Sequence, residues 1–124
     1  MGSVKALLDT NVLIDYLNGV DAASDEIARY DNPMISPITW MEVMVGALDH
    51  EQDAVRAFLA RFVQVAIDAE VADAAVALRR VHRLRLPDAI IWASAHCENA
   101  LLVTRNTKDF PADAPNVRTP YQIP

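Results

Sequence analysis

Short apolar runs alternate with helical patterns along the sequence, and this alternation limits most strongly the folds open to the chain. Strands are expected at 6–8, 34–35, 63–67 and 101–103, and near Val117. Helices are expected at 11–18, 22–30, 37–48, 55–62, 71–81 and 88–97. Strands that alternate with helices pair in parallel through right-handed crossovers. We therefore expect an α/β fold with a short central parallel sheet covered on both faces.

Length and composition favour one domain with its own hydrophobic core. The 124 residues are 52% hydrophobic and 23% charged, so residues 1–124 are expected to form a single domain. No apolar run is long enough to span a membrane, and the first residues lack the pattern of a signal peptide. The single cysteine, Cys97, is typical of a reducing compartment. We expect a cytoplasmic protein with no membrane association.

The charge of the chain is unevenly distributed. The net charge of −6 argues against a generic nucleic-acid coat protein. Residues 1–78 carry 4 basic and 13 acidic side chains, whereas residues 79–124 carry 7 basic and 4 acidic ones. Four of the basic side chains lie close together, at Arg79, Arg80, Arg83 and Arg85. They either form a solvated helix face or a positive rim that steers phosphate groups.

Four carboxylates occupy unusual positions in this pattern. Asp9 directly follows the first strand, Asp88 opens a helix, and Asp109 lies shortly after the strand at 101–103. Each of these has an ordinary explanation, as a helix cap or a turn residue. Glu42 lies in a helix that is apolar nearly all round, where it either reaches solvent at a helix edge or is buried beside a cation that offsets the cost of burying a carboxylate. Because ligand sites lie at the carboxyl ends of parallel strands, the four acids are expected to meet there.

A cluster of carboxylates favours a particular chemistry. Hard oxygen ligands suit Mg²⁺ or Mn²⁺, and no His or Cys pair has the spacing of a zinc site. Such ions hydrolyse phosphodiesters without a covalent nucleophile, by activating water and neutralising developing charge. A phosphohydrolase with Asp9 as nucleophile is a weaker hypothesis, because the second acid it needs two residues later is Asn11. The three glycines cannot form a P-loop or a dinucleotide-binding motif.

The ordered set of acidic motifs resembles a known family. Segments 8–15, 86–93 and 104–110, together with Glu42, look like those of PIN-domain nucleases. The likeness is closest to the short VapC-type toxins of type II toxin–antitoxin pairs, including the FitB-like branch. It implies a three-layer α/β/α domain, an Mg²⁺- or Mn²⁺-dependent endoribonuclease activity, a homodimer and a cognate antitoxin. Candidate RNA substrates are tRNA and rRNA.

The resemblance also implies roles for individual residues. Metal binding and catalysis would fall to Asp9, Glu42, Asp88 and Asp109. Residues that would orient these ligands by hydrogen bonding are Thr10, Asn11, Thr104 and Asn106. Basic residues near the acids are candidates for RNA contact, with ordinary surface charge as the alternative: Arg105, Lys108 and Arg85.

Two other functions stay open on sequence grounds. One is a PIN-like domain that has lost catalysis and serves as a protein-binding module. The other is an RNA-maturation nuclease that works without an antitoxin.

Overall fold

The central sheet has the parallel topology that the alternating pattern predicts. A computed structural model describes residues 4–111 and 113–123. Its strands are β1 (Ala6–Leu8), β2 (Met34–Ile35), β3 (Val63–Gln64), β4 (Leu101–Val103) and β5 (Val117–Arg118). They pair in the order β3-β2-β1-β4-β5, and every neighbouring pair is parallel. The predicted α/β fold with a short parallel sheet is confirmed.

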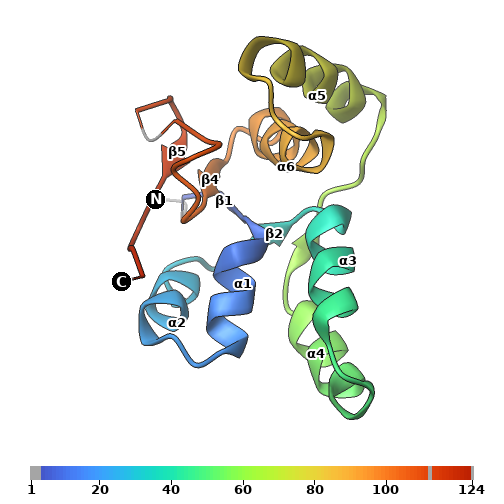
Figure 1. Ribbon diagram of the computed structural model, residues 1–124, viewed down its shortest axis with the longest axis vertical. Helices are drawn as coiled ribbons and strands as arrows, with labels where there is room; N and C mark the ends of the chain where they lie inside the picture. The colour runs from blue at the N-terminus through green and yellow to red at the C-terminus, as the bar shows by residue number, and fades with distance from the viewer. Residues whose placement is uncertain (1–3, 112, 124) are drawn as a thin grey trace.

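Helices cover both faces of this sheet and complete three layers. They are α1 (Thr10–Leu17), α2 (Asp21–Ala28), α3 (Pro37–Gly46), α4 (Gln52–Leu59), α5 (Ala69–His82) and α6 (Leu86–Cys97). A short 3₁₀ turn, Asp49–Glu51, joins α3 to α4. In Figure 1, α5 and α6 lie above the strands, whereas α1 and α2 lie below them and α3 and α4 run down one side.

Alternation along the strands explains the two cores. Leu7 and Leu102 pack with α5 and α6, and Trp92 of α6 belongs to the same cluster. Leu8 and Val103 point to the other face and pack with residues of α1 to α4. Successive side chains of a strand point to opposite faces, so a fully apolar triplet such as 6–8 has to be covered from both sides.

Local signals set the helix ends close to the predicted positions. The Ser36 hydroxyl accepts a hydrogen bond from the backbone N–H of Ile38 at 3.1 Å, and Pro37 is the first residue of α3. Helix α5 begins after Asp68, which caps it, and ends at Arg83, whose φ of 56° is left-handed. The predicted strand at 63–67 is shorter than expected and ends at Gln64, because its partner β2 offers only two residues.

The chain has no helix suited to crossing a lipid bilayer within the part that the structure describes.

Candidate active site

Asp9 lies at the carboxyl end of the buried strand β1. Its backbone N–H donates to the carbonyl of Val103 at 2.9 Å, so β1 and β4 end side by side. Asp9 is also the N-cap of α1, and its Oδ1 accepts from the N–H of Thr10 at 2.8 Å. Although it is a carboxylate, its side chain is only 4% exposed. The role of Asp9 as a helix cap therefore explains the hydrogen bond of Oδ1 but not the surroundings of Oδ2.

The second oxygen of Asp9 is held by two polar side chains. The Thr104 hydroxyl donates to Asp9 Oδ2 at 2.8 Å, and the Asn11 amide donates to the same oxygen at 3.1 Å. Thr104 follows β4 and is fully buried. The Asn11 amide also lies 3.3 Å from the Thr104 hydroxyl. Two residues predicted to orient a metal ligand thus contact Asp9 directly and fix its rotamer.

Burial gives Asp9 unusual electrostatics. The pKa of Asp9 is raised from 3.8 to about 6, chiefly by desolvation. The hydrogen bonds from Thr104 and Thr10 oppose this rise, and the nearby carboxylates of Asp88 and Glu42 add to it. Desolvation also raises the pKa of Asp88, with Asp109 and Glu42 adding to the rise and Arg85 opposing it. The four predicted acids therefore share one electrostatic field at this edge of the sheet, and a bound cation would relieve it.

Asp88 enters the site from the first turn of α6. Pro87 lies in the same turn, where its missing N–H carries no penalty. Asp88 is buried, and its Oδ2 lies 3.4 Å from Nε of Arg85, whose side chain is 79% exposed. An acid in the first helical turn is also favoured by the helix dipole, but that effect does not require burial.

Glu42 lies on an exposed face of α3. Of the two alternatives that the sequence leaves open, the structure shows the one in which Glu42 reaches solvent at a helix edge, and Met41 and Val45 on the same helix are exposed as well. Only Thr39 and Val43 of α3 are fully buried. Glu42 is still tied to the site, because the Thr10 hydroxyl donates to its Oε1 at 2.7 Å and lies 3.0 Å from the Thr39 hydroxyl.

Asp109 lies in the turn after β4, and Asn106 organises that turn. The Asn106 amide donates to Asp109 Oδ2 at 2.9 Å, and its Oδ1 accepts from the backbone N–H groups of Lys108 and Asp109, each at 3.1 Å. The N–H of Asn106 donates to the Thr104 hydroxyl at 3.0 Å. Asp109 therefore has a structural role in the turn, and its charge also raises the pKa of Asp88.

Arg105 makes contacts that favour a positioning role over an RNA contact. Its Nε and Nη2 donate to the two oxygens of Asp15 at 2.7 and 3.0 Å. The hydroxyl of Tyr121 donates to Asp15 Oδ2 at 2.9 Å. The backbone N–H of Arg105 donates to Oδ1 of Asn11 at 3.2 Å. This network ties α1 to the turn after β4 and so holds Asn11 and Thr104 in register with Asp9.

Sequence reasoning missed Asp15 and Tyr121. Asp15 is 4% exposed on α1 and has the same burial as Asp9, but a charged pair neutralises it. Asp15 lies six residues after Asp9 on a helix with an apolar face, and this position could have indicated a buried, paired carboxylate. Tyr121 is 106 residues from Asp15, so no local pattern links them.

The carboxylate oxygens of the four predicted acids suit a hard divalent cation, although the acids do not surround a single point. Across residues 4–111 and 113–123, no three His, Cys, Asp or Glu side chains lie close enough together to enclose a metal ion by themselves. Mg²⁺ keeps several of its waters and is commonly held by one or two carboxylates, so it does not need such a cage. The buried carboxylate of Asp9, its raised pKa and its acidic neighbours are consistent with that mode of binding.

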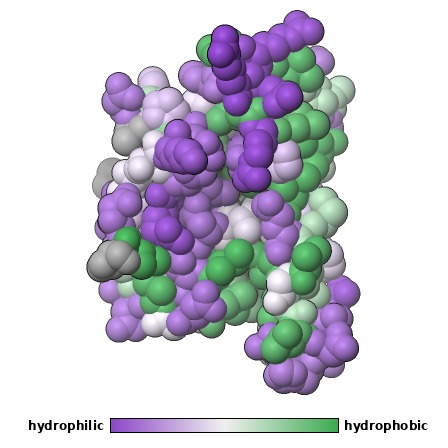
Figure 2. All heavy atoms as spheres, viewed as in Figure 1, coloured by the Kyte–Doolittle hydropathy of each residue, from purple (hydrophilic) through white to green (hydrophobic). Residues whose placement is uncertain are grey.

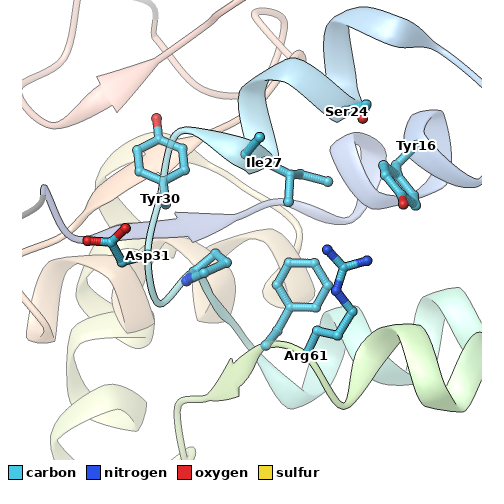
Figure 3. A pocket seen from close by; sticks show the side chains of 9 residues that line it. Tyr16, Ser24, Ile27, Tyr30, Asp31 and Arg61 are labelled. Atoms are coloured by element: carbon cyan, nitrogen blue, oxygen red, sulfur yellow. The ribbon is translucent and has the colours of Figure 1, made fainter.

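The acids do not line the pocket shown in Figure 3. That pocket has a volume of about 260 Å³ and lies between α1, α2 and the segment before β3, with Tyr16, Ile27 and Tyr30 among its lining residues. Arg61 projects toward it from the residues just before β3 (Figure 3). Asp9 lies instead at the carboxyl end of β1, and Asp88 in the first turn of α6.

Comparison with known proteins gives the family. The PIN domain family model matches residues 6–112. Ribonuclease VapC10 of Mycobacterium tuberculosis is 34% identical over 126 residues, which span 95% of this chain and 94% of that protein. A toxin–antitoxin complex from Klebsiella pneumoniae contains a chain that is 46% identical, with a TM-score of 0.91 over 96% of this chain and 100% of that one. A chain of VapBC2 from Rickettsia felis, bound to a promoter DNA fragment, is 26% identical with a TM-score of 0.75, covering 92% and 96% of the two chains. This chain belongs to the PIN-domain family.

Proposed function

We propose that this protein is a metal-dependent endoribonuclease that hydrolyses RNA phosphodiesters and acts as the toxin of a type II toxin–antitoxin system. The observation that carries the proposal is the buried Asp9 carboxylate, held by Thr104 and Asn11 in the field of Asp88 and Glu42. A buried cluster of this kind costs stability unless it serves a cation. The relationship to ribonucleases and to toxins of toxin–antitoxin complexes supports the reaction and the setting.

We infer that the ion is Mg²⁺ or Mn²⁺ and that Asp9, Glu42 and Asp88 hold it, with Asp109 in the same field. When bound, such an ion supplies a hydroxide-like nucleophile at neutral pH and neutralises charge on the phosphate. The protein's own contribution is orientation. Thr104 and Asn11 hold one oxygen of Asp9, and the Thr10 hydroxyl holds Glu42, so both carboxylates are fixed before substrate arrives.

We propose that this protein binds a cognate antitoxin and a second copy of this chain. Exposed apolar surface supports this proposal. Met41 and Val45 of α3 are 48% and 87% exposed. A groove of about 510 Å³ lies nearby, with Ile14, Leu17 and Val55 among its lining residues. Figure 2 shows hydrophobic residues gathered along the side of the molecule between α5 and α3. An apolar patch of this kind on a small protein marks an interface.

Two further proposals follow from the sequence. We propose that residues 1–124 form one PIN domain, of which the family model covers 6–112. We also propose that the protein acts in the cytoplasm, where its RNA substrate lies and where Cys97 stays reduced.

Cleavage of RNA tests the proposed function directly. Bulk tRNA and rRNA are incubated with the protein in Mg²⁺ or Mn²⁺, and parallel reactions contain EDTA. Asp9→Asn is the inactive variant, and Asp53→Asn, an exposed acid on α4, is the matched control. We expect metal-dependent cutting that Asp53→Asn retains and Asp9→Asn loses. Equal cutting by Asp9→Asn would remove the assignment, and no cutting together with no metal binding would favour the protein-binding module.

A further inference from the structure

We propose that the arginine ridge, defined here as Arg79, Arg80, Arg83 and Arg85 at the junction of α5 and α6, holds the phosphates of the RNA strand beside the acidic site. This inference rests on the proposed ribonuclease function and extends it to the way in which substrate is held. The ridge lies where α5 ends and the chain turns into α6 (Figure 1). Its four arginines fall within seven residues of a chain whose net charge is −6.

The ridge surrounds a hollow on the surface. Three of its arginines, Arg79, Arg80 and Arg83, line a depression of about 520 Å³ together with Val76 and Leu86. All three arginine side chains are exposed. Arg83 ends α5 in a left-handed conformation with φ of 56°, which turns the chain sharply, so that α5 and the start of α6 both contribute to the same hollow. The hollow is therefore apolar in part and positively charged on its rim.

The ridge is continuous with the acidic site. Leu86, which lines the hollow, is the first residue of α6 and lies two residues before Asp88. Arg85 directly precedes Leu86, and its Nε lies 3.4 Å from Asp88 Oδ2 while its side chain is 79% exposed. An RNA strand whose scissile phosphate lies at the acids would thus place neighbouring phosphates along the ridge.

The buried ion pairs use other arginines of the chain. Arg105 donates to both oxygens of Asp15, and Arg118 donates to both oxygens of the buried Glu26 at 2.8 and 2.9 Å. Breaking such a pair to contact phosphate would leave a buried carboxylate uncompensated, which is strongly destabilising. These two arginines are therefore committed to the fold.

The other described cations are held elsewhere or stand alone. Lys5 pairs with Glu98 at 3.6 Å, and Arg29 pairs with Glu26 at 3.7 Å. Arg56 and Arg61 lie over the rings of Trp40 and Phe58. Lys108 is exposed in the turn beside Asp109 and is a single charge. Among residues 4–111 and 113–123, the ridge is the place where several exposed arginines adjoin the acidic site.

A positively charged surface offsets the repulsion between the acidic site and RNA. Asp9, Glu42 and Asp88 repel a polyanion, and the net charge of −6 adds to that repulsion. Affinity for RNA comes mainly from basic side chains that displace counterions from phosphates, and each contact changes log K by about 0.7 for a tenfold change in salt. A local positive rim next to an acidic centre therefore recruits the strand that the centre itself repels.

The test compares two double variants of equal charge change. Arg80→Gln/Arg83→Gln alters the ridge, and Arg56→Gln/Arg61→Gln alters α4 and the residues just after it. Arg79 is left in place because its guanidinium donates to the carbonyl of Leu84. Both are built in full-length Asp9→Asn protein, so that RNA is bound without being cut. Fluorescence anisotropy measures the binding of fluorescein-labelled bulk tRNA at salt concentrations from about 0.05 to about 0.5 M. This range is wide enough to give the salt dependence that phosphate contacts produce.

We expect the ridge variant to lose two phosphate contacts. Its salt slope should fall by about 1.4 and its affinity at 0.1 M salt by about 25-fold, whereas the α4 variant should stay within about threefold of the parent. Arg80→Lys/Arg83→Lys, which keeps the charge, should restore most of the affinity. Melting temperatures check that each variant folds, and the single variant Arg80→Gln serves if the double variant does not.

Four results would overturn the inference. Three concern RNA binding: an unchanged salt slope in the ridge variant, equal losses in both double variants, and no tRNA binding by the Asp9→Asn parent. The fourth is a shift in the oligomeric state of the ridge variant by sedimentation, which would make the ridge a contact between protein copies. RNA binding through the ridge by a wild-type protein that cuts no RNA would overturn the ribonuclease assignment and leave the ridge standing.

Discussion

Replacing Asp9 with asparagine should stabilise the metal-free protein at neutral pH. Burial raises the pKa of Asp9 from 3.8 to about 6 in the folded state. Below pH 3.8 the carboxyl group is protonated in both the folded and unfolded states, so it does not affect stability. Above about pH 6 it is ionised in both states, and its ionisation has then cost the folded state about 3 kcal/mol. The destabilisation grows as the pH rises through this window.

The substitution removes that charge but also loses a hydrogen bond. In Asp9→Asn the new amide oxygen still accepts from the N–H of Thr10, and the new amide N–H can donate to the Thr104 hydroxyl. The Asn11 amide loses one of its two acceptors and keeps the Thr104 hydroxyl, and the lost hydrogen bond costs about 1 kcal/mol. The net gain at pH 7.5 is therefore about 2 kcal/mol, or a rise in Tm of about 6–10 °C for a domain of this size. At pH 4 no rise is expected.

Thermal unfolding followed by circular dichroism in EDTA at pH 7.5 and pH 4 measures this effect. Asp53→Asn on the exposed side of α4 is the control and should leave Tm unchanged at both values of pH. Saturating Mn²⁺ should reverse the order, because only the wild-type protein gains binding energy from the ion. A fall in Tm of equal size at both values of pH would refute the reasoning, since it would mean that Asp9 is a structural cap and carries no strained charge.

Three further substitutions separate structural from chemical roles. Asp15→Asn should lower the free energy of unfolding in urea by about 1–3 kcal/mol, because the Arg105 guanidinium, whose side chain is 32% exposed, would lose its charged partner; a change below about 0.5 kcal/mol would contradict the positioning network. Thr104→Val should weaken Mn²⁺ binding by about 10- to 100-fold in calorimetry, and unchanged affinity would show that the hydroxyl does not orient Asp9. Asp109→Asn should reduce single-turnover cleavage by less than about tenfold, since the amide keeps the acceptor for the turn. A loss as large as that of Asp9→Asn would place Asp109 among the metal ligands.

The parallel sheet and the position of two acids were predictable because the signals are local. The triplet 6–8 ends at Asp9, and Pro87 marks the helix that Asp88 opens, so short-range patterns carry both acids to the sheet edge. For Glu42 the sequence left burial and exposure at a helix edge both open, and the structure shows it exposed. Composition shows that α3 is apolar, but only packing decides which of its faces is covered.

Long-range pairs were the part that the sequence could not supply. Asp15 meets Arg105 and Tyr121 across 90 and 106 residues, and neither contact follows from a local period. These contacts change the interpretation of Arg105, which local charge alone suggested as an RNA contact. The hydrogen bond of Thr104 to Asp9 also joins residues far apart in the sequence, and Asn11 donates to the same carboxylate. Both residues were nevertheless indicated by the resemblance to PIN-domain nucleases.

Binding of Mn²⁺ measured by titration calorimetry tests the central claim most directly, that the carboxylates at the sheet edge hold a divalent cation. Wild-type protein and the Asp53→Asn control should bind Mn²⁺ with the same affinity, and Asp9→Asn should lose at least tenfold in affinity. Mn²⁺ binding of equal strength by Asp9→Asn, or no binding by the wild-type protein, would contradict the account.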